Sequence, residues 1–270
     1  MLSQLTIIGL GLNDERGLSL KGLDLAREAD CVFAEFYTSL MPQLDVRNLE
    51  KLIGKPILLL ERSDVEENAQ HMILEKIGSK KAAFLVPGDP MLATTHIDLR
   101  LRAEKAGIKT KVIPGASIFS AVLALTGLRA YKFGRTVTLP RLETGKIPES
   151  PYDHIRTNLH VGLHTLALLD IAVERGYCMR VREGLEYIRK VELQRAEHIV
   201  GDSGLVVGVA RAGADDAIVK AGTLSRLLYC DFGGPPHSLV IPSKLHFVEA
   251  EALKTLAGAD PENLKGYVSP

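Results

Sequence analysis

Glycine gathers in three short stretches of the first half of the chain, each placed where an apolar run stops. The stretches are "GLG" at residues 9–11, "VPGDPM" at residues 86–91 and "IPGAS" at residues 113–117. Glycine lets the backbone approach a ligand closely, because no Cβ stands in the way. Pro-Gly pairs are also common turn residues, so any one stretch alone predicts no more than a loop. All three together predict one ligand-binding crevice.

Asp89 adds a carboxylate to the second glycine stretch. A carboxylate at this place is suited to bind ribose hydroxyls or an ammonium group. The alternative is a local role, in which the Asp89 side chain accepts a hydrogen bond from the turn that it begins.

A dinucleotide site of Rossmann type is a weaker interpretation of "GLG". The fingerprint G-x-G-x-x-G needs a third glycine where this chain has Asp14. Glu35 follows at about the spacing of a ribose-binding acid, but Asp14 and Glu15 place negative charge where a pyrophosphate would need helix amides. Phosphate binding by this loop is therefore disfavoured.

The histidines offer no metal site of recognised spacing. His160 and His164 are four residues apart, but Gly162 and the strand-like run after His164 indicate that the two do not share a helix. The sequence contains no H-E-x-x-H motif, cysteine cluster, nucleophile elbow or Walker loop. No metal is expected.

Length and composition are those of an ordinary globular protein. The chain has 270 residues, enough for two modest domains, and its 33 basic and 33 acidic residues give zero net charge. This balance lacks the basic footprint of most nucleic-acid-binding proteins, so no direct nucleic-acid partner is predicted. No apolar run is long enough for a membrane span, and the scattered Cys31, Cys178 and Cys230 indicate free thiols. We expect a cytoplasmic protein.

The first half alternates short β-type runs with helical patterns. Strands are expected at "LTIIG", "CVFAEF", "PILLL", "KAAFLV" and "TKVI", and helices at residues 18–29, 63–78, 99–106 and 116–125. Ser63-x-x-Glu66 has the spacing of a capping box at a helix start. The alternation predicts a mostly parallel sheet covered on both faces, with its ligand beyond the carboxyl ends of the strands.

The pattern changes after Gly127. "YKFGRTVTLPR" is typical of a linker running into a new sheet, and "TLALLDI", a charged helix at 181–197, "GLVVGVAR" and "HSLVIP" follow. We therefore predict an α/β fold of two tandem domains, residues 1–128 and residues 129–270.

Six stretches in order along essentially the whole chain carry a resemblance to a known family. They are "GLGLND", "AEFYTS", "PGDPMLATTH", "IPGASI", "HTLALLDI" and "PPHSLVIP". Together they resemble the diphthine synthases, a family of methyltransferases in the tetrapyrrole methylase superfamily. "GDPM" with a downstream "ATTH", followed later by "HTLALLDI", separates this family from relatives that methylate corrins or ribosomal RNA. The resemblance implies two tandem αβα domains of tetrapyrrole-methylase type, with the cofactor cleft between them.

The resemblance also implies an activity and a set of site residues. Family members transfer methyl groups from S-adenosyl-L-methionine, leaving S-adenosyl-L-homocysteine, to the amino nitrogen of a modified histidine on translation elongation factor 2, in diphthamide biosynthesis. They are typically homodimers. Carried over to this chain, the cofactor contacts are Leu10, Asp89, Leu92, Ser117, Ile118, Leu169, Ala210 and His237. Leu92 stands where the family often has valine, a change that a backbone contact would tolerate.

The sequence identifies no catalytic base. The acceptor nitrogen must be unprotonated to attack, which needs a base or a path to water. Glu35, Tyr37 and His96 are candidates by their expected position near the crevice, and the alternative for each is a structural role. Two other functions stay open: a superfamily relative with a corrin or RNA acceptor, and a nucleotide-sensing or scaffold module that binds a ligand without catalysis.

Overall fold

The computed structural model describes residues 3–142 and 147–268, and the chain divides into two compact units. Unit 1 comprises Met1–Ser117 with Val173–Gly176, and unit 2 comprises Ile118–Ala172 with Tyr177–Pro270. The change of unit after Ser117 comes earlier in the chain than the boundary expected after residue 128. Helix α6 (Ile118–Thr126) accounts for the difference, because it packs with α10 (Phe247–Ala257) in a core cluster of unit 2.

Unit 1 alternates strands and helices along the chain. Its strands are β1 (Gln4–Gly9), β2 (Cys31–Glu35), β3 (Ile57–Leu60), β4 (Lys81–Val86) and β5 (Lys109–Ile113). Its helices are η1 (Glu15–Gly17), α1 (Leu20–Glu28), α2 (Val46–Ile53), α3 (Arg62–Glu66), η2 (Gln70–Leu74), α4 (Glu75–Ile77) and α5 (His96–Lys105).

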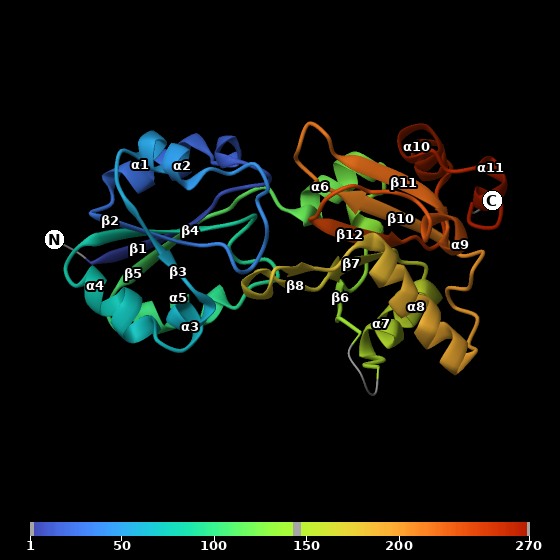
Figure 1. The fold of residues 1–270 in the computed structure, drawn as a ribbon, viewed down its shortest axis with the longest axis horizontal. Coiled ribbons are helices and arrows are strands. Elements are labelled where there is room, and N and C mark those ends of the chain that lie inside the picture. The colour runs from blue at the N-terminus through green and yellow to red at the C-terminus, as the bar shows by residue number, and fades with distance from the viewer. Residues whose placement is uncertain (1–2, 143–146, 269–270) are drawn as a thin grey trace. The chain divides into compact units, whose positions relative to one another are not determined.

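The five strands of unit 1 form one sheet in the order β3-β2-β4-β1-β5, with every neighbouring pair parallel. Helices α1 and α2 cover one face, and α3, α4 and α5 cover the other (Figure 1). Successive residues of a strand enter the two opposite core clusters, such as Ile7 and Ile8 of β1. The predicted parallel sheet with two covered faces is confirmed.

The segment after β3 departs from the single helix expected at residues 63–78. It consists of α3, the π-helical turn η2 and then α4. The expected capping box of Ser63 and Glu66 is wrong, because the N-cap is Glu61, whose backbone N–H donates to the Asp64 carboxylate at 2.9 Å. Glu66 instead accepts hydrogen bonds from Arg62 at 3.3 Å and from the Thr95 hydroxyl at 3.0 Å.

Unit 2 contains the second sheet. Its strands are β6 (Val137–Leu139), β7 (Thr165–Leu169), β10 (Leu205–Ala210), β11 (Ile218–Thr223) and β12 (His237–Ile241), with a separate hairpin of β8 (Ile171–Ala172) and β9 (Tyr177–Cys178). Besides α6 and α10, its helices are η3 (Ala130–Lys132), α7 (Ser150–His160), α8 (Val181–Arg195), α9 (Leu224–Leu227) and α11 (Pro261–Leu264); η4 (Val173–Arg175), at the tip of the hairpin, belongs to unit 1.

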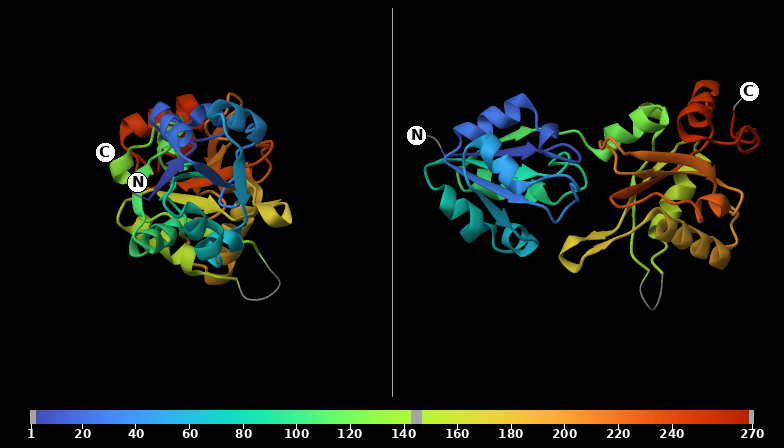
Figure 2. Two further views of the ribbon diagram at one scale, coloured as in Figure 1. Left: turned by 90° about the vertical axis from the view of Figure 1, so that its left-hand side faces the viewer. Right: turned by 45° about the horizontal axis from the view of Figure 1, so that its top comes forward.

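The sheet of unit 2 is mixed, in the order β11-β10-β12-β7-β6. Only the pair of β6 and β7 is parallel within the described residues, and the other three pairs are antiparallel. Helices α6 and α10 lie on one face and α7 and α8 on the other, and further views of the ribbon are given in Figure 2. The expected α/β character of both halves is confirmed.

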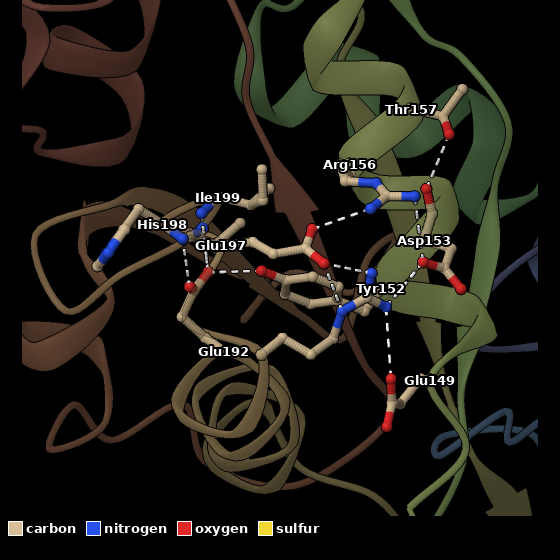
Figure 3. A network of polar contacts seen from close by, with 11 residues as sticks. Glu149, Tyr152, Asp153, Arg156, Thr157, Glu192, Glu197, His198 and Ile199 are labelled. Atoms are coloured by element: carbon tan, nitrogen blue, oxygen red, sulfur yellow. Dashed lines mark hydrogen bonds and ion pairs between the residues drawn. The ribbon is translucent and has the colours of Figure 1, made fainter.

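Glu192, near the end of α8, holds the loop that follows this helix (Figure 3). Its carboxylate accepts the backbone N–H groups of His198 at 2.6 Å and Ile199 at 2.9 Å, and the hydroxyl of Tyr152 from α7 at 2.7 Å. These donors offset the loss of water around a buried charge. The loop is thereby fixed to both helices.

A second buried carboxylate, Glu249 of α10, binds the segment that follows α6. It accepts the Lys132 ammonium at 2.7 Å, the backbone N–H of Arg129 at 2.9 Å and the His164 Nε2 at 3.2 Å. Burial alone would raise the pKa of Glu249, but hydrogen bonds from Lys132, from the backbone of His246 and Arg129 and from His164 lower it to about 2. The segment that follows α6 within unit 2 is therefore anchored electrostatically to α10.

His164 contributes to this anchor. His160 ends α7 whereas His164 lies outside any helix, so the prediction that they do not share a helix is confirmed. Among the described residues, no three His, Cys, Asp or Glu side chains are grouped so that they could hold a metal ion. Over the same ranges, no helix is long and apolar enough to cross a membrane.

Replacing Glu249 with glutamine should destabilise unit 2 by on the order of 2 kcal/mol near pH 7, because Lys132 loses its buried counter-ion. The folded pKa of about 2 lies below the ordinary glutamate pKa of 4.5, so this stability is present above pH 4.5 and is lost as the pH falls toward 2. Denaturant unfolding of both proteins should thus show a smaller difference at about pH 3 than near pH 7. Glu251→Gln, at an exposed position of the same helix, is the control; an equal difference at both pH values would contradict the assignment.

Candidate functional site

The three glycine stretches of unit 1 meet at the carboxyl ends of β1, β4 and β5. Gly11 and Gly88 exchange two backbone hydrogen bonds, with N···O distances of 3.2 and 2.7 Å. The Asp89 carboxylate accepts the backbone N–H of Gly115 at 3.2 Å, which joins the third stretch to the second. The predicted convergence of the loops is confirmed.

Two of these glycines are required because backbone packs directly on backbone. A Cβ on Gly9 would stand 2.5 Å from the carbonyl oxygen of Gly88 and 2.6 Å from the nitrogen of Gly115. A Cβ on Gly115 would overlap the same Gly88 oxygen. The space that glycine was expected to leave for a ligand is thus occupied, at these two positions, by the neighbouring loop.

Asp89 performs the local role that was its alternative interpretation. One carboxylate oxygen accepts the backbone N–H of Met91 at 2.9 Å, and the other accepts that of Gly115. Each oxygen keeps a further acceptor position, since a carboxylate has about four. The side chain is therefore held in place and can still receive an ammonium or hydroxyl group.

The loop after β1 lacks the features of a phosphate site. Asp14 caps the short helix η1, and its carboxylate already accepts the backbone N–H of Arg16 at 2.9 Å. The side-chain hydrogen bond from Arg16 holds the pKa of Asp14 below its usual value. Helix α1 begins only at Leu20, so its N-terminal amides do not open directly from the glycine loop. The dinucleotide interpretation finds no support in this geometry.

The predicted contacts of unit 1 differ in exposure. Leu10 is fully buried, with its side chain in the core, so only its backbone is available to a ligand. Leu92 is 42% exposed, at the end of a turn closed by its N–H to the carbonyl of Asp89. Ser117 is nearly buried, at the end of the third glycine stretch.

Three of the predicted contacts of unit 2 lie side by side at one end of its sheet. Ala210 of β10 is directly opposite His237 of β12. On the other side of β12, Ser238 is opposite Leu168, which puts Leu169 of β7 next to His237. Ile118 is apart from this row: it begins α6 and packs partly against the core cluster on the opposite face.

Both ring nitrogens of His237 are engaged. Its Nδ1 accepts the backbone N–H of Val181, the first residue of α8, at 3.1 Å. Its Nε2 therefore carries the proton and donates it to the carbonyl of Gly234 at 2.8 Å. Burial lowers the pKa of His237, because it disfavours the charged imidazolium, and the ring is therefore neutral.

Glu35, Tyr37 and His96 come together in unit 1. Two backbone N–H groups, of Tyr37 and Thr38, donate to the Glu35 carboxylate at 2.9 and 3.0 Å. The His96 ring lies between the Tyr37 hydroxyl, 3.4 Å from its Nε2, and the carbonyl of Pro90, 3.2 Å from its Nδ1. The group thus links the loop after β2 to the second glycine stretch.

Burial argues against a catalytic role for this group. Glu35 and His96 are fully buried, and burial raises the pKa of Glu35 and lowers that of His96 to about 4. A neutral His96 can donate from Nδ1 to Pro90 and accept at Nε2 from Tyr37. The three side chains therefore fit the structural alternative, holding the "PGDPM" loop from beneath.

Sequence reasoning missed two residues that hold the predicted loops. Thr38 donates its hydroxyl to Glu35 at 2.5 Å, and Arg211, directly after Ala210, binds the loop that precedes β12. The signal for Arg211 was the stretch "ARAGADDA", in which a basic residue at a strand end precedes two acidic residues in a glycine-containing turn.

Comparisons with known proteins agree with the resemblance seen in the sequence. Residues 4–228 match the family of Tetrapyrrole (Corrin/Porphyrin) Methylases. Diphthine synthase from Methanocella arvoryzae is 50% identical over 254 residues, which cover 94% of this chain and 98% of the relative. The one from Methanosarcina barkeri is 51% identical over 259 residues, covering 94% and 96%. A crystal structure of diphthine synthase has a TM-score of 0.86 at 39% identity, covering 97% of this chain and 98% of that one.

Gly115→Ala should destabilise unit 1 by on the order of 2 kcal/mol, because the added Cβ meets rigid backbone at Gly88. Gly201→Ala is the matched control, since a Cβ there meets nothing within 4 Å, and it should change stability by about 0.5 kcal/mol or less. Denaturant unfolding measures both values. Equal stabilities of the two variants would show that the loops can separate without cost.

Proposed function

Because the chain belongs to the tetrapyrrole (corrin/porphyrin) methylases and, within them, to the diphthine synthases, we propose that it methylates translation elongation factor 2. Family membership makes it an S-adenosyl-L-methionine-dependent methyltransferase of diphthamide biosynthesis. The proposed acceptor is the amino nitrogen of the modified histidine, and the proposed location is the cytoplasm.

The observation that carries the proposal is the placement of the predicted cofactor contacts. In unit 1 they lie on the converged loops at the carboxyl ends of three parallel strands, where ligands bind in such sheets. In unit 2 three of them form a row across neighbouring strand ends. The proposed contacts of S-adenosyl-L-methionine are Leu10, Asp89, Leu92 and Ser117 from unit 1, and Ile118, Leu169, Ala210 and His237 from unit 2.

The residues present fit a cofactor that carries an ammonium group and hydroxyls but no phosphate. The Asp89 carboxylate is held by two backbone N–H groups and keeps acceptor positions for a cation or a ribose. Leu10 offers only its backbone, and the amide that a phosphate would need at Arg16 is already bonded to Asp14. The product S-adenosyl-L-homocysteine would keep the same contacts.

The protein's contribution to this chemistry is to bind and orient. Bound S-adenosyl-L-methionine supplies a methyl group that is activated by its positively charged sulfonium sulfur. When the methyl group is transferred, that sulfur becomes a neutral thioether. Fixing the acceptor nitrogen in line with that methyl supplies most of the rate enhancement expected from such a site. Glu35, His96 and His237 are buried and bonded, so we propose that the acceptor amine loses its proton to water before it attacks.

The chain is also proposed to act as a homodimer, as the resemblance implies. Support comes from β3, an edge strand whose Leu58 and Leu59 are 42% and 51% exposed. An open sheet edge is a surface on which a strand of a second chain can pair, and the exposed leucines add apolar area there.

Asp89→Asn should weaken binding of S-adenosyl-L-methionine by about tenfold or more, because a charge-assisted hydrogen bond becomes a neutral one. Asp98→Asn, at an exposed helical position paired with Arg102, should leave the affinity unchanged. Isothermal calorimetry measures both constants. Equal binding by Asp89→Asn would remove this carboxylate from the proposed site.

Methyl transfer is tested with elongation factor 2 that carries the aminocarboxypropyl-histidine. Mass spectrometry before and after treatment should show added methyl groups at that histidine, and their number. Transfer to a corrin precursor or to ribosomal RNA instead would give the chain a different acceptor. Cofactor binding without transfer to any of the three would favour a ligand-binding module.

The pH profile should contain one rising limb. If water takes the proton, kcat/KM for the acceptor increases with pH and levels off above the pKa of the acceptor amine. Initial rates with labelled cofactor at constant ionic strength measure this profile. A bell shape that shifts in Tyr37→Phe would instead indicate an acid or base on the protein.

A further inference from the structure

Arg211 has an unusual backbone for its residue type. It follows Ala210 at the end of β10 and has a φ of +49°, in the left-handed region that favours glycine. A residue other than glycine is strained in this backbone conformation, and it keeps the conformation only where the surrounding structure fixes it. A strained residue directly beside a predicted cofactor contact is a candidate for a functional role.

The side chain of Arg211 explains what fixes it. It is 12% exposed, and its guanidinium donates four hydrogen bonds. Nη1 donates to the carbonyls of Phe232 and Gly234, both at 2.8 Å. Nε and Nη2 donate to the side chain and carbonyl of Asp216, at 2.7 and 2.8 Å. One planar cation thus joins the turn after β10 to the loop that precedes β12.

The loop at residues 232–236 is shaped to receive this guanidinium. Gly233 has a φ of +68°, and a Cβ there would lie 2.8 Å from Nη1 of Arg211. The backbone N–H of Arg211 also donates to the carbonyl of Pro236 at 2.8 Å. Backbone and side chain of one residue therefore hold both ends of the loop.

Arg211 and His237 meet on the same atom. The carbonyl oxygen of Gly234 accepts from Nη1 of Arg211 and from Nε2 of His237, each at 2.8 Å. Removing the guanidinium would leave this carbonyl and that of Phe232 short of donors, and it would loosen the partner that orients the His237 ring. The row of Ala210 and His237 would then lose its fixed geometry.

We propose that Arg211 is a positioning residue for cofactor binding, which holds the loop at residues 232–236 so that Ala210 and His237 present a preformed surface. The inference rests on the function proposed above and adds a residue outside the proposed contacts. Arg211 acts through these neighbours and does not itself touch the reacting atoms, so its loss should affect cofactor affinity much more than kcat.

Two variants at Arg211 separate the side chain from the backbone, and a third variant is the control. Arg211→Gly relieves the left-handed strain but removes the guanidinium, whereas Arg211→Lys keeps the charge but not the planar set of donors. Both should raise the Kd for S-adenosyl-L-methionine by about tenfold or more, with kcat at saturating cofactor changed by about twofold or less. Arg189→Ala, which removes an exposed ion pair with Asp202 in the same unit, should leave the Kd unchanged.

Calorimetric titration and thermal unfolding on the same samples decide the outcome. A lower unfolding temperature with an unchanged Kd would overturn the inference, since Arg211 would then serve stability alone. Should the Arg211 variants fail to fold, Asp216→Asn carries the test at a side chain that is 62% exposed, with a several-fold weaker Kd expected and an unchanged Kd overturning it. A wild-type protein that binds no cofactor would overturn the proposed function instead, and this inference with it.

Discussion

The carbonyl oxygen of Gly88 is the atom on which the loop cluster of unit 1 depends. It accepts from Gly11, and it lies where a side chain on Gly9 or Gly115 would have to go. Three strand ends can approach this closely only because they meet as bare backbone. The parallel sheet brings the strand ends to one edge, and the Glu35–His96 group supports the middle loop from below at Pro90. The loops are held together here by backbone hydrogen bonds and close backbone packing rather than by large side chains.

Unit 2 reaches a comparable result by different means. Its sheet is mainly antiparallel, so residues distant in sequence, Leu169, Ala210 and His237, become neighbours through strand register. Register is set by the alternation of the two core clusters, because a slip by one residue would turn every buried side chain to the wrong face. Charged groups then secure the connections, with Glu192 holding the loop after α8 and Glu249 holding the segment after α6.

The sequence was most informative where a pattern is local. Alternation of strands and helices located the five strands of unit 1, and strand ends located the three glycine loops. It was less informative where long-range packing decides. Contacts across three loops decide that Gly9 faces Gly115 rather than a ligand. The buried group around His96 joins residues whose spacing in the sequence gives no sign of their contact. The capping box predicted at Ser63 was wrong for another reason. The Asp64 carboxylate forms the capping hydrogen bond with the backbone of Glu61, so the helix begins earlier than the sequence predicted. The stretch "ARAGADDA" placed a basic residue at a strand end, but the left-handed backbone of Arg211 and the carbonyls that its guanidinium binds are seen only in the structure.

The contact between Arg211 and Gly233 also constrains how this protein can change over time. A side chain at position 233 would collide with the guanidinium, and a smaller residue at position 211 would leave carbonyls unsatisfied while the glycine remains. Neither position can be altered freely while the other stays as it is. Among descendants of this chain the two should therefore be replaced as a pair, so that the loop before β12 is inherited as a unit with the turn that follows β10.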